Sequence, residues 1–168
     1  ALTMLLFGHS VNAQQEMQLT SVAFSNDGEI PKTYTCDDQN ISPPIAWVGA
    51  PKSAQSFALI MTDNDALSLA WQHWVVYDIP AKVNELSIAT KGIITGKNSS
   101  GDFGYLGPCP PDRGVVHQYN FVLFALDIKR LVLSNKEPTA AELTQAMNGH
   151  IVAQAMLNGQ YTRGAGAS

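Results

Sequence analysis

The sequence lacks the features that mark membrane spans, nucleic-acid binders and multi-domain chains. No apolar run approaches the roughly 20 residues that a membrane helix needs. Its 168 residues carry 10 Lys and Arg against 14 Asp and Glu, a net charge of −4, and contain no basic run. We therefore expect no nucleic-acid partner and no integral membrane protein. No repeat, low-complexity tract or linker divides the chain, which predicts a single domain over residues 14–168.

A short apolar run lies at the start of the sequence, over residues 2–8. Val11 and Ala13 follow it, at the −3 and −1 positions of a signal-peptidase site. We interpret residues 1–13 as the remnant of a secretory signal peptide, which predicts a periplasmic or secreted protein. The alternative is an N-terminal strand or helix that packs on the domain.

Cysteine is scarce, with Cys36 and Cys109 alone in the sequence. In an exported protein such a pair suggests one disulfide, worth roughly 3–5 kcal/mol on the chain-entropy model for so long a loop. Two separate thiols are the alternative and would be the default in the cytosol. No CxxC or HxxxH spacing accompanies the pair. Metal binding by these cysteines is therefore weakly supported, and we expect no cofactor.

Apolar runs separated by proline and glycine pairs predict a mainly β fold. Strands are expected over residues 18–24, 43–48, 56–62, 74–79 and 119–127. The runs at 56–62 and 120–126 are almost continuously apolar, which suits strands that are covered on both faces. Many short strands with regular turns favour a β-sandwich with a few peripheral helices.

One helix is predicted near the C-terminus. Thr139 is a candidate N-cap, and Glu142 three residues later completes a capping box. Apolar residues continue at helical spacing as far as Ala155. In this interpretation Gly149 marks a kink or a break between two short helices, and Gly159 is a plausible stop.

Two polar clusters adjoin predicted strands. Asp63 and Asp65 end a buried strand, so these carboxylates must be solvated, paired or functional. The alternative is a polar turn. His73 begins an apolar strand two residues after Trp71, a suitable place for a pocket rim. The alternative is a core histidine bonded to a backbone carbonyl.

A third cluster joins a stiff proline-rich loop, residues 107–111, to His117 and Tyr119. The loop can hold its remaining N–H groups toward a ligand at little entropic cost, although a plain turn is the alternative. His117 and Tyr119 are two residues apart, so they face the same side of a strand. Imidazole and hydroxyl groups donate hydrogen bonds to phosphate oxygens, and a carboxylate such as Asp63 would raise a histidine's pKa. Together the clusters offer an anion site if the fold brings them together.

Five stretches of the chain, in a fixed order, give a reason to expect that the fold brings the three polar clusters together. They are residues 35–44 (TCDDQNISPP), 63–67 (DNDAL), 71–76 (WQHWVV), 103–119 with its GYLGPCPP run and HQY triplet, and 149–155 (GHIVAQA). In this order they resemble the motifs of the phosphatidylethanolamine-binding protein (PEBP) family, in its bacterial Raf-kinase-inhibitor-like (YbhB/YbcL) branch. The last stretch resembles the family's C-terminal helix. The resemblance covers almost the whole mature chain.

The resemblance implies a PEBP-like β-sandwich with peripheral helices, including a C-terminal helix, and a surface pocket for phosphate, phosphorylethanolamine, acetate or similar anions. Carried over by position, the pocket would be lined by Asp63, Asp65, Trp71, His73, Cys109, Pro110, Pro111, His117 and Tyr119. We expect a binding protein and not an enzyme, as a monomer or homodimer, which inhibits or modulates a partner protein such as a kinase or peptidase. We also predict a Cys36–Cys109 bond that tethers residues 40–42 to the proline-rich loop.

An enzyme is the competing hypothesis. Asp63, Asp65, His73 and His117 could ligate a metal or act as the acid and base of a hydrolase. No nucleophile elbow, HExxH or phosphate-binding-loop pattern accompanies them.

The chain departs from the family pattern at Asn64 and Leu67, which replace both prolines of the Asp-Pro-Asp-Ala-Pro signature. A cis bond before Leu67 would cost about 2.5–4 kcal/mol, so we predict a trans bond there. The loop, and with it the pocket rim that selects the ligand, is expected to be reshaped.

Overall fold

Nine strands and one α-helix make up the part of the chain that the computed structural model describes, residues 16–66, 70–111 and 113–164. The elements are β1 (Gln18–Thr20), β2 (Gly28–Glu29), the 3-10 helix η1 (Lys32–Tyr34), β3 (Ile45–Val48), β4 (Ser56–Asp63), β5 (Trp71–Pro80), β6 (Glu85–Leu86), β7 (Ile94–Thr95), β8 (Val116–Leu126), α1 (Ala140–Met147) and β9 (Ile151–Thr162). The mainly β prediction is confirmed. The predicted signal-peptide remnant and the bond before Leu67 lie outside the described residues.

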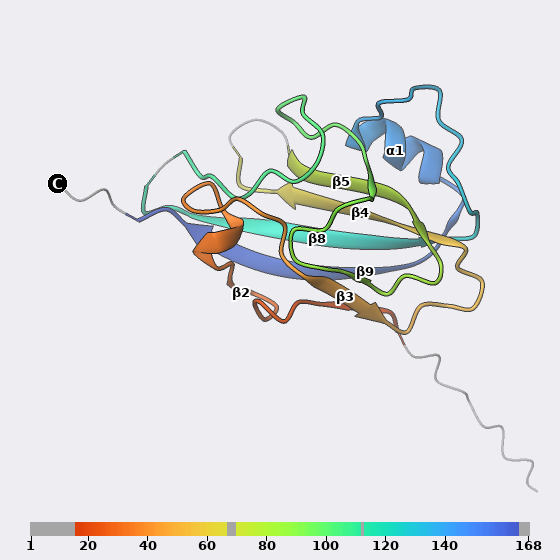
Figure 1. Cartoon of the computed structure of the whole chain (residues 1–168), viewed down its shortest axis with the longest axis horizontal. Helices are drawn as coiled ribbons and strands as arrows, with labels where there is room; N and C mark the ends of the chain where they lie inside the picture. The colour runs from red at the N-terminus through yellow and green to blue at the C-terminus, as the bar shows by residue number, and fades with distance from the viewer. Residues whose placement is uncertain (1–15, 67–69, 112, 165–168) are drawn as a thin grey trace, which may run out of the picture.

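The strands form two sheets, shown in Figure 1. The larger has the order β2-β9-β8-β4-β5-β7 and the smaller the order β1-β3-β6. Alternate residues of β4 face opposite sides of the larger sheet. On one side they join a core shared with the smaller sheet, where the rings of Trp47 and Phe57 meet with centroids 5.3 Å apart. On the other side they join a second core beneath α1 that includes Leu143 and Met147. The prediction that residues 56–62 are covered on both faces is confirmed.

The helix α1 begins with the predicted capping box. Thr139 Oγ1 accepts a hydrogen bond from the Glu142 N–H at 3.3 Å, and the Glu142 carboxylate accepts one from the Thr139 N–H at 2.8 Å. Each side chain thus satisfies a backbone donor that the first helical turn would leave free. The helix ends at Met147.

The predicted continuation of this helix to Ala155 is wrong. Residues Ile151–Thr162 form β9, which pairs antiparallel with β8 along its whole length. Gly149 adopts a left-handed φ of 82° at the junction, a conformation that stops the helix. The resemblance of residues 149–155 to a C-terminal helix was therefore misleading for the secondary structure of this stretch.

The larger sheet brings three strand ends together, at the left in Figure 1. At this end of the sheet β4 ends while β5 and β8 begin. Here Asp63 pairs with Trp71 of β5 on one side and with Tyr119 of β8 on the other. Both β5 and β8 begin about three residues earlier than the apolar runs predicted, because pairing with β4 extends β5 and pairing with β9 extends β8 into polar sequence. The polar clusters therefore belong to the sheet itself.

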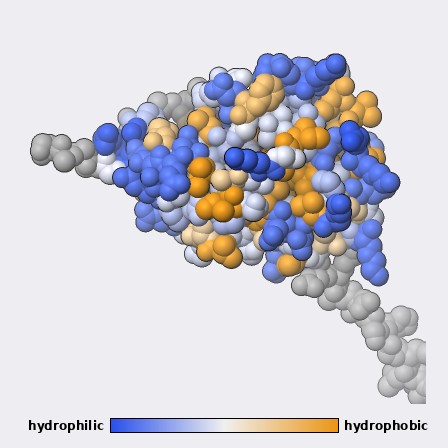
Figure 2. All heavy atoms as spheres, in the orientation of Figure 1, coloured by the Kyte–Doolittle hydropathy of each residue, from blue (hydrophilic) through white to orange (hydrophobic). Residues whose placement is uncertain are grey.

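Exposed apolar side chains are scattered over the surface. Figure 2 shows apolar residues mainly in the middle of the visible face and hydrophilic residues toward its ends. Val22 and Val132 are the most exposed of the large apolar side chains, at 94% and 89%. Such side chains are common on globular proteins and mark no site by themselves. None of the helices in the described ranges has the length and apolar character that a bilayer crossing requires.

Candidate functional site

A buried histidine–aspartate pair joins the end of β4 to the start of β8. His117 Nδ1 lies 2.7 Å from Asp63 Oδ2, and the two side chains are 5% and 6% exposed. The other carboxylate oxygen of Asp63 accepts the Asp65 N–H at 2.9 Å. Asp63 therefore has a partner on each oxygen. Because its Nδ1–H donates to the carboxylate, a neutral His117 carries its lone pair on Nε2.

The second histidine of the site occupies an irregularity in the pairing of β4 and β5. Met61 pairs with Trp74 and Thr62 with Gln72, so His73 between them has no counterpart on β4. A bulge of this kind re-aims a side chain, and bulges are common beside functional sites.

Backbone groups of the facing loop hold His73 in place. Its Nδ1–H donates to Leu106 O at 2.7 Å, and its own carbonyl accepts the Leu106 N–H at 2.9 Å. The side chain is buried, and burial lowers the pKa of His73 despite the opposing effect of this carbonyl. The neutral ring with its lone pair on Nε2 is thereby favoured.

Tyr119 contacts both imidazole rings. Its ring meets His73 edge-on at 5.3 Å between centroids and stacks on His117 at 6.5 Å. The side chain is fully buried, and within the described residues its hydroxyl has no hydrogen-bond partner. Burial, followed by the charge of Asp63, raises the pKa of Tyr119 well above its usual range. Tyr119 thus positions the two rings and does not line the cavity.

The proline-rich loop closes the cavity and is tied to the segment after η1. Cys36 and Cys109 form the predicted disulfide. The Gly107 N–H donates to Asn40 Oδ1 at 2.7 Å, so a hydrogen bond joins Asn40 to this loop in addition to the disulfide. A Cβ at Gly107 would lie 2.5 Å from Tyr34 O and closer still to Asn40 Oδ1, so only glycine fits this approach.

These elements enclose a cavity of about 310 Å³, lined by Asp63, Ala66, Trp71, His73, Leu106, Gly107, Cys109, Pro111 and His117. Six of the nine residues predicted for the pocket are among them. The other three surround it: Tyr119 and Pro110 are buried, and exposed Asp65 accepts the Gln118 N–H at 2.7 Å. The described residues contain no group of three or more His, Cys, Asp and Glu side chains arranged to hold a metal ion. That the lining residues bind a ligand stays a prediction.

Three lining residues were not predicted, namely Ala66, Leu106 and Gly107. Leu106 acts through its backbone carbonyl, which no side-chain pattern in a sequence reveals. Gly107 lies inside the proline-rich motif, and its position next to Pro108 was the signal that could have identified it. The rim predicted to be reshaped includes residues 67–69, which lie outside the described part of the chain.

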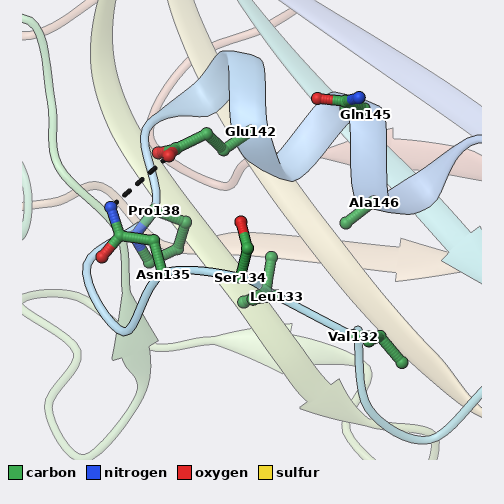
Figure 3. A pocket seen from close by; sticks show the side chains of 8 residues that line it. All are labelled: Val132, Leu133, Ser134, Asn135, Pro138, Glu142, Gln145 and Ala146. Carbon is green, nitrogen blue, oxygen red and sulfur yellow. Dashed lines mark hydrogen bonds between the residues drawn. The ribbon is translucent and has the colours of Figure 1, made fainter.

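A second hollow, of about 370 Å³, lies beside α1 (Figure 3). Its lining consists of Val132, Leu133, Ser134, Asn135, Pro138, Glu142, Gln145 and Ala146. The one charged group, Glu142, is engaged in the capping box and also accepts a hydrogen bond from Asn135 at 3.4 Å. The Thr139 N–H lowers the pKa of Glu142, which keeps it ionised in this structural role. This hollow therefore offers no free reactive group, unlike the cavity between the histidines.

Comparisons with known proteins agree on one family. A family model described as phosphatidylethanolamine-binding protein matches residues 20–162. A "UPF0098 protein" of Methanothermobacter thermautotrophicus is 43% identical over 157 residues, which cover 88% of this chain and 100% of the relative. The crystal structure of a PEBP homolog from Chlamydia trachomatis matches with a TM-score of 0.82 and 39% identity, over 88% of this chain and 98% of that one. Escherichia coli YbcL, described as a member of the mammalian PEBP family, matches with a TM-score of 0.80 and 29% identity, over 88% and 99%.

Proposed function

The chain belongs to the phosphatidylethanolamine-binding protein family, and on this premise we propose that it binds small phosphate-type anions in the cavity between His73 and His117. In this proposal the protein is exported, carries no enzymatic activity and presents a ligand of headgroup size, such as phosphate or phosphorylethanolamine. The cavity of about 310 Å³ suits a molecule of that size.

The observation that carries the proposal is the shared geometry of the two imidazoles. Each Nδ1–H is committed to a fixed acceptor, Asp63 Oδ2 for His117 and Leu106 O for His73. Each Nε2 is then the nitrogen available to a ligand. A neutral Nε2 accepts a proton from a P–OH group, whereas a protonated ring donates to a P–O⁻ oxygen. In both cases one proton is shared between ring and ligand, so binding tightens as the pH falls.

Export is supported by the disulfide together with the sequence before residue 14. Disulfides persist mainly in oxidising compartments outside the cytosol. Cys36 and Cys109 are bonded, and both belong to the segments that form the cavity wall and its tether. We propose that the mature protein works in the periplasm or outside the cell.

Modulation of a partner protein, such as a kinase or a peptidase, is the second part of the proposal. Val115, just before β8, and Val116, its first residue, are 46% and 49% exposed and precede His117 in the sequence. Exposed apolar side chains beside a polar cavity suit a protein contact that senses whether the cavity is filled.

The test is thermal unfolding and calorimetric titration with inorganic phosphate and with phosphorylethanolamine. A ligand at 100 times its Kd should stabilise the wild type by about 2.7 kcal/mol and raise its Tm. A His73→Gln/His117→Gln double variant should lose the shift. His150→Gln is the matched control, because His150 bonds a carboxylate through the same nitrogen at 2.8 Å but lies outside the cavity. Equal shifts in all three proteins, or none in the wild type, would refute the site.

Metal analysis of the same preparations separates the hydrolase alternative from binding. Stoichiometric metal in the wild type that is lost in His73→Ala would replace the binding proposal. The binding proposal expects the same low metal content in both proteins.

A further inference from the structure

The Cys36–Cys109 disulfide meets the cavity from one side. Cys109 is exposed and lines the cavity, whereas Cys36 is half-buried and does not line it. Which of the two sulfurs of a disulfide is attacked depends largely on how accessible each one is. A molecule bound in the cavity would therefore reach the bond through Cys109, with Cys36 as the leaving thiolate.

Three hydrogen bonds hold the cavity loop independently of the disulfide. The Cys36 N–H donates to Pro108 O at 3.1 Å, and the Gly107 N–H donates to Asn40 Oδ1 at 2.7 Å. The Tyr105 hydroxyl donates to Tyr34 O at 2.7 Å. Because these bonds fix residues 105–108, opening the disulfide need not dismantle the cavity.

A proton acceptor shares the cavity with the exposed cysteine. His73 lines the same cavity and donates its Nδ1–H to Leu106 O, so its Nε2 carries a lone pair. Burial lowers the pKa of His73, which keeps this lone pair available at neutral pH. A thiol becomes an effective nucleophile when it gives up its proton, and a buried neutral imidazole can take that proton.

We propose that the cavity is also a site of thiol–disulfide exchange for small thiols that carry an anionic group. The inference rests on the proposed anion binding, here by the Nε2–H of a protonated His117, which would hold the carboxylate, sulfonate or phosphate of the thiol and leave the Nε2 lone pair of His73 free. The S–H proton passes to His73, and the thiolate attacks Cys109 Sγ. A new S–S bond joins the small molecule to Cys109 as the Cys36–Cys109 bond breaks. Cys36 leaves as a thiolate and takes up a proton, so one disulfide replaces another with no external oxidant.

The test compares two thiols of similar acidity, anionic 2-mercaptoethanesulfonate and neutral 2-mercaptoethanol, on the full chain. After an acid quench and alkylation, peptide mass spectrometry locates the adduct and the free cysteine. Each rate is divided by that of the same thiol with a small reference disulfide. We expect the adduct on Cys109, the alkyl group on Cys36, and a rate ratio about tenfold or more in favour of the anionic thiol, as one charge-assisted hydrogen bond would give.

Two controls keep the result tied to the cavity. Inorganic phosphate should slow the anionic thiol, while chloride at equal ionic strength should not. His73→Gln should lower the anionic rate, and His150→Gln should leave it unchanged. Equal normalised rates for the two thiols, an adduct on Cys36, or no effect of phosphate would overturn the proposal. Phosphate binding measured on the same sample separates the two failures: if phosphate binds and the rates are equal, only the exchange is wrong, and if phosphate does not bind, the proposed function falls as well.

Discussion

The molecule contains two histidine–aspartate pairs with almost the same bond in opposite surroundings. His117 Nδ1 and Asp63 Oδ2 are 2.7 Å apart, and His150 Nδ1 and Asp127 Oδ1 are 2.8 Å apart. The first pair has side chains that are 5% and 6% exposed, whereas the second pair is 40% and 44% exposed. Both pairs flank β8, the first at its start and the second just after its end.

The difference shows that burial, and not the bond itself, separates a candidate site from a surface contact. Water competes for the groups of the exposed pair and screens their charges, so that pair contributes little. The buried pair has no such competitor, and its Nε2 adjoins a cavity that also holds His73. A sequence-level rule that looks only for a histidine near an aspartate would rank the two pairs equally.

The largest expected difference between the two ends of the sheet is covalent, because the disulfide lies only at the cavity end among the described residues. Reduction, or a Cys36→Ser/Cys109→Ser variant, should lower the free energy of unfolding by roughly 3–5 kcal/mol, since the unfolded chain regains the entropy of a long loop. Urea unfolding of oxidised and reduced protein measures this. A loss below about 1 kcal/mol would contradict the entropic account and would point to native-state strain or to structure in the unfolded chain that offsets it.

Breaking each histidine–aspartate pair in turn compares them directly. Asp63→Ala leaves His117 Nδ1–H and the Asp65 N–H without their acceptor, and we expect a loss of about 2–4 kcal/mol. Asp127→Ala removes an exposed partner and should cost about 0–1 kcal/mol. Equal losses in urea unfolding would contradict the argument from burial.

The pH dependence of stability should come from the buried end. Burial holds the pKa of His73 below its unfolded value of about 6.5, so the unfolded chain binds more protons in the window between the two values. The contribution of His73 to stability should therefore fall as the pH is lowered through about 6.5 and level off below its folded pKa. The free energy of unfolding of His73→Gln, measured from unfolding curves at several pH values, should depend less on pH than that of the wild type. If the stability of the variant depends on pH as steeply as that of the wild type, another group is responsible for the effect.

The smallest expected effect concerns the exposed pair. His150→Gln should change the free energy of unfolding by no more than about 1 kcal/mol, and high salt should abolish the difference because both side chains are solvated. Unfolding at low and at high salt checks this. A larger, salt-resistant loss would mean that the pair also fixes the backbone, where the Asp127 N–H donates to His150 O at 3.0 Å.

Apolar runs were sufficient to predict the central strands, because strands buried on both faces are almost continuously apolar. The capping box was sufficient to predict the start of α1. Neither signal was sufficient to predict β9. Ile151 and Ala155 are four residues apart, a spacing that suits a helical turn but is also a multiple of the strand period of two. The alternation of buried Ala155 and Leu157 with exposed Met156 decides for a strand, and the pairing with β8 imposes it.

The site was predictable in its side chains and less so in its geometry. His73, His117 and Asp63 could be identified because polar groups at the ends of apolar strands are costly to bury unless they are paired or functional. The roles of the two aspartates differ only through tertiary contacts, since Asp63 bonds His117 whereas Asp65 bonds the Gln118 N–H. The carbonyl of Leu106 that orients His73 has no signature in the sequence at all.

Because β8 separates the two pairs, one sample of this protein carries its own internal standard. Ten strand residues at about 3.3 Å each place His117 and Asp127 on the order of 33 Å apart, well beyond a Debye length in ordinary buffers. In an NMR titration with a ligand the imidazole of His117 reports the cavity, while that of His150 lies outside it, with the same nitrogen bonded to a carboxylate in each. A ligand that enters the cavity moves one resonance and leaves the other as the blank.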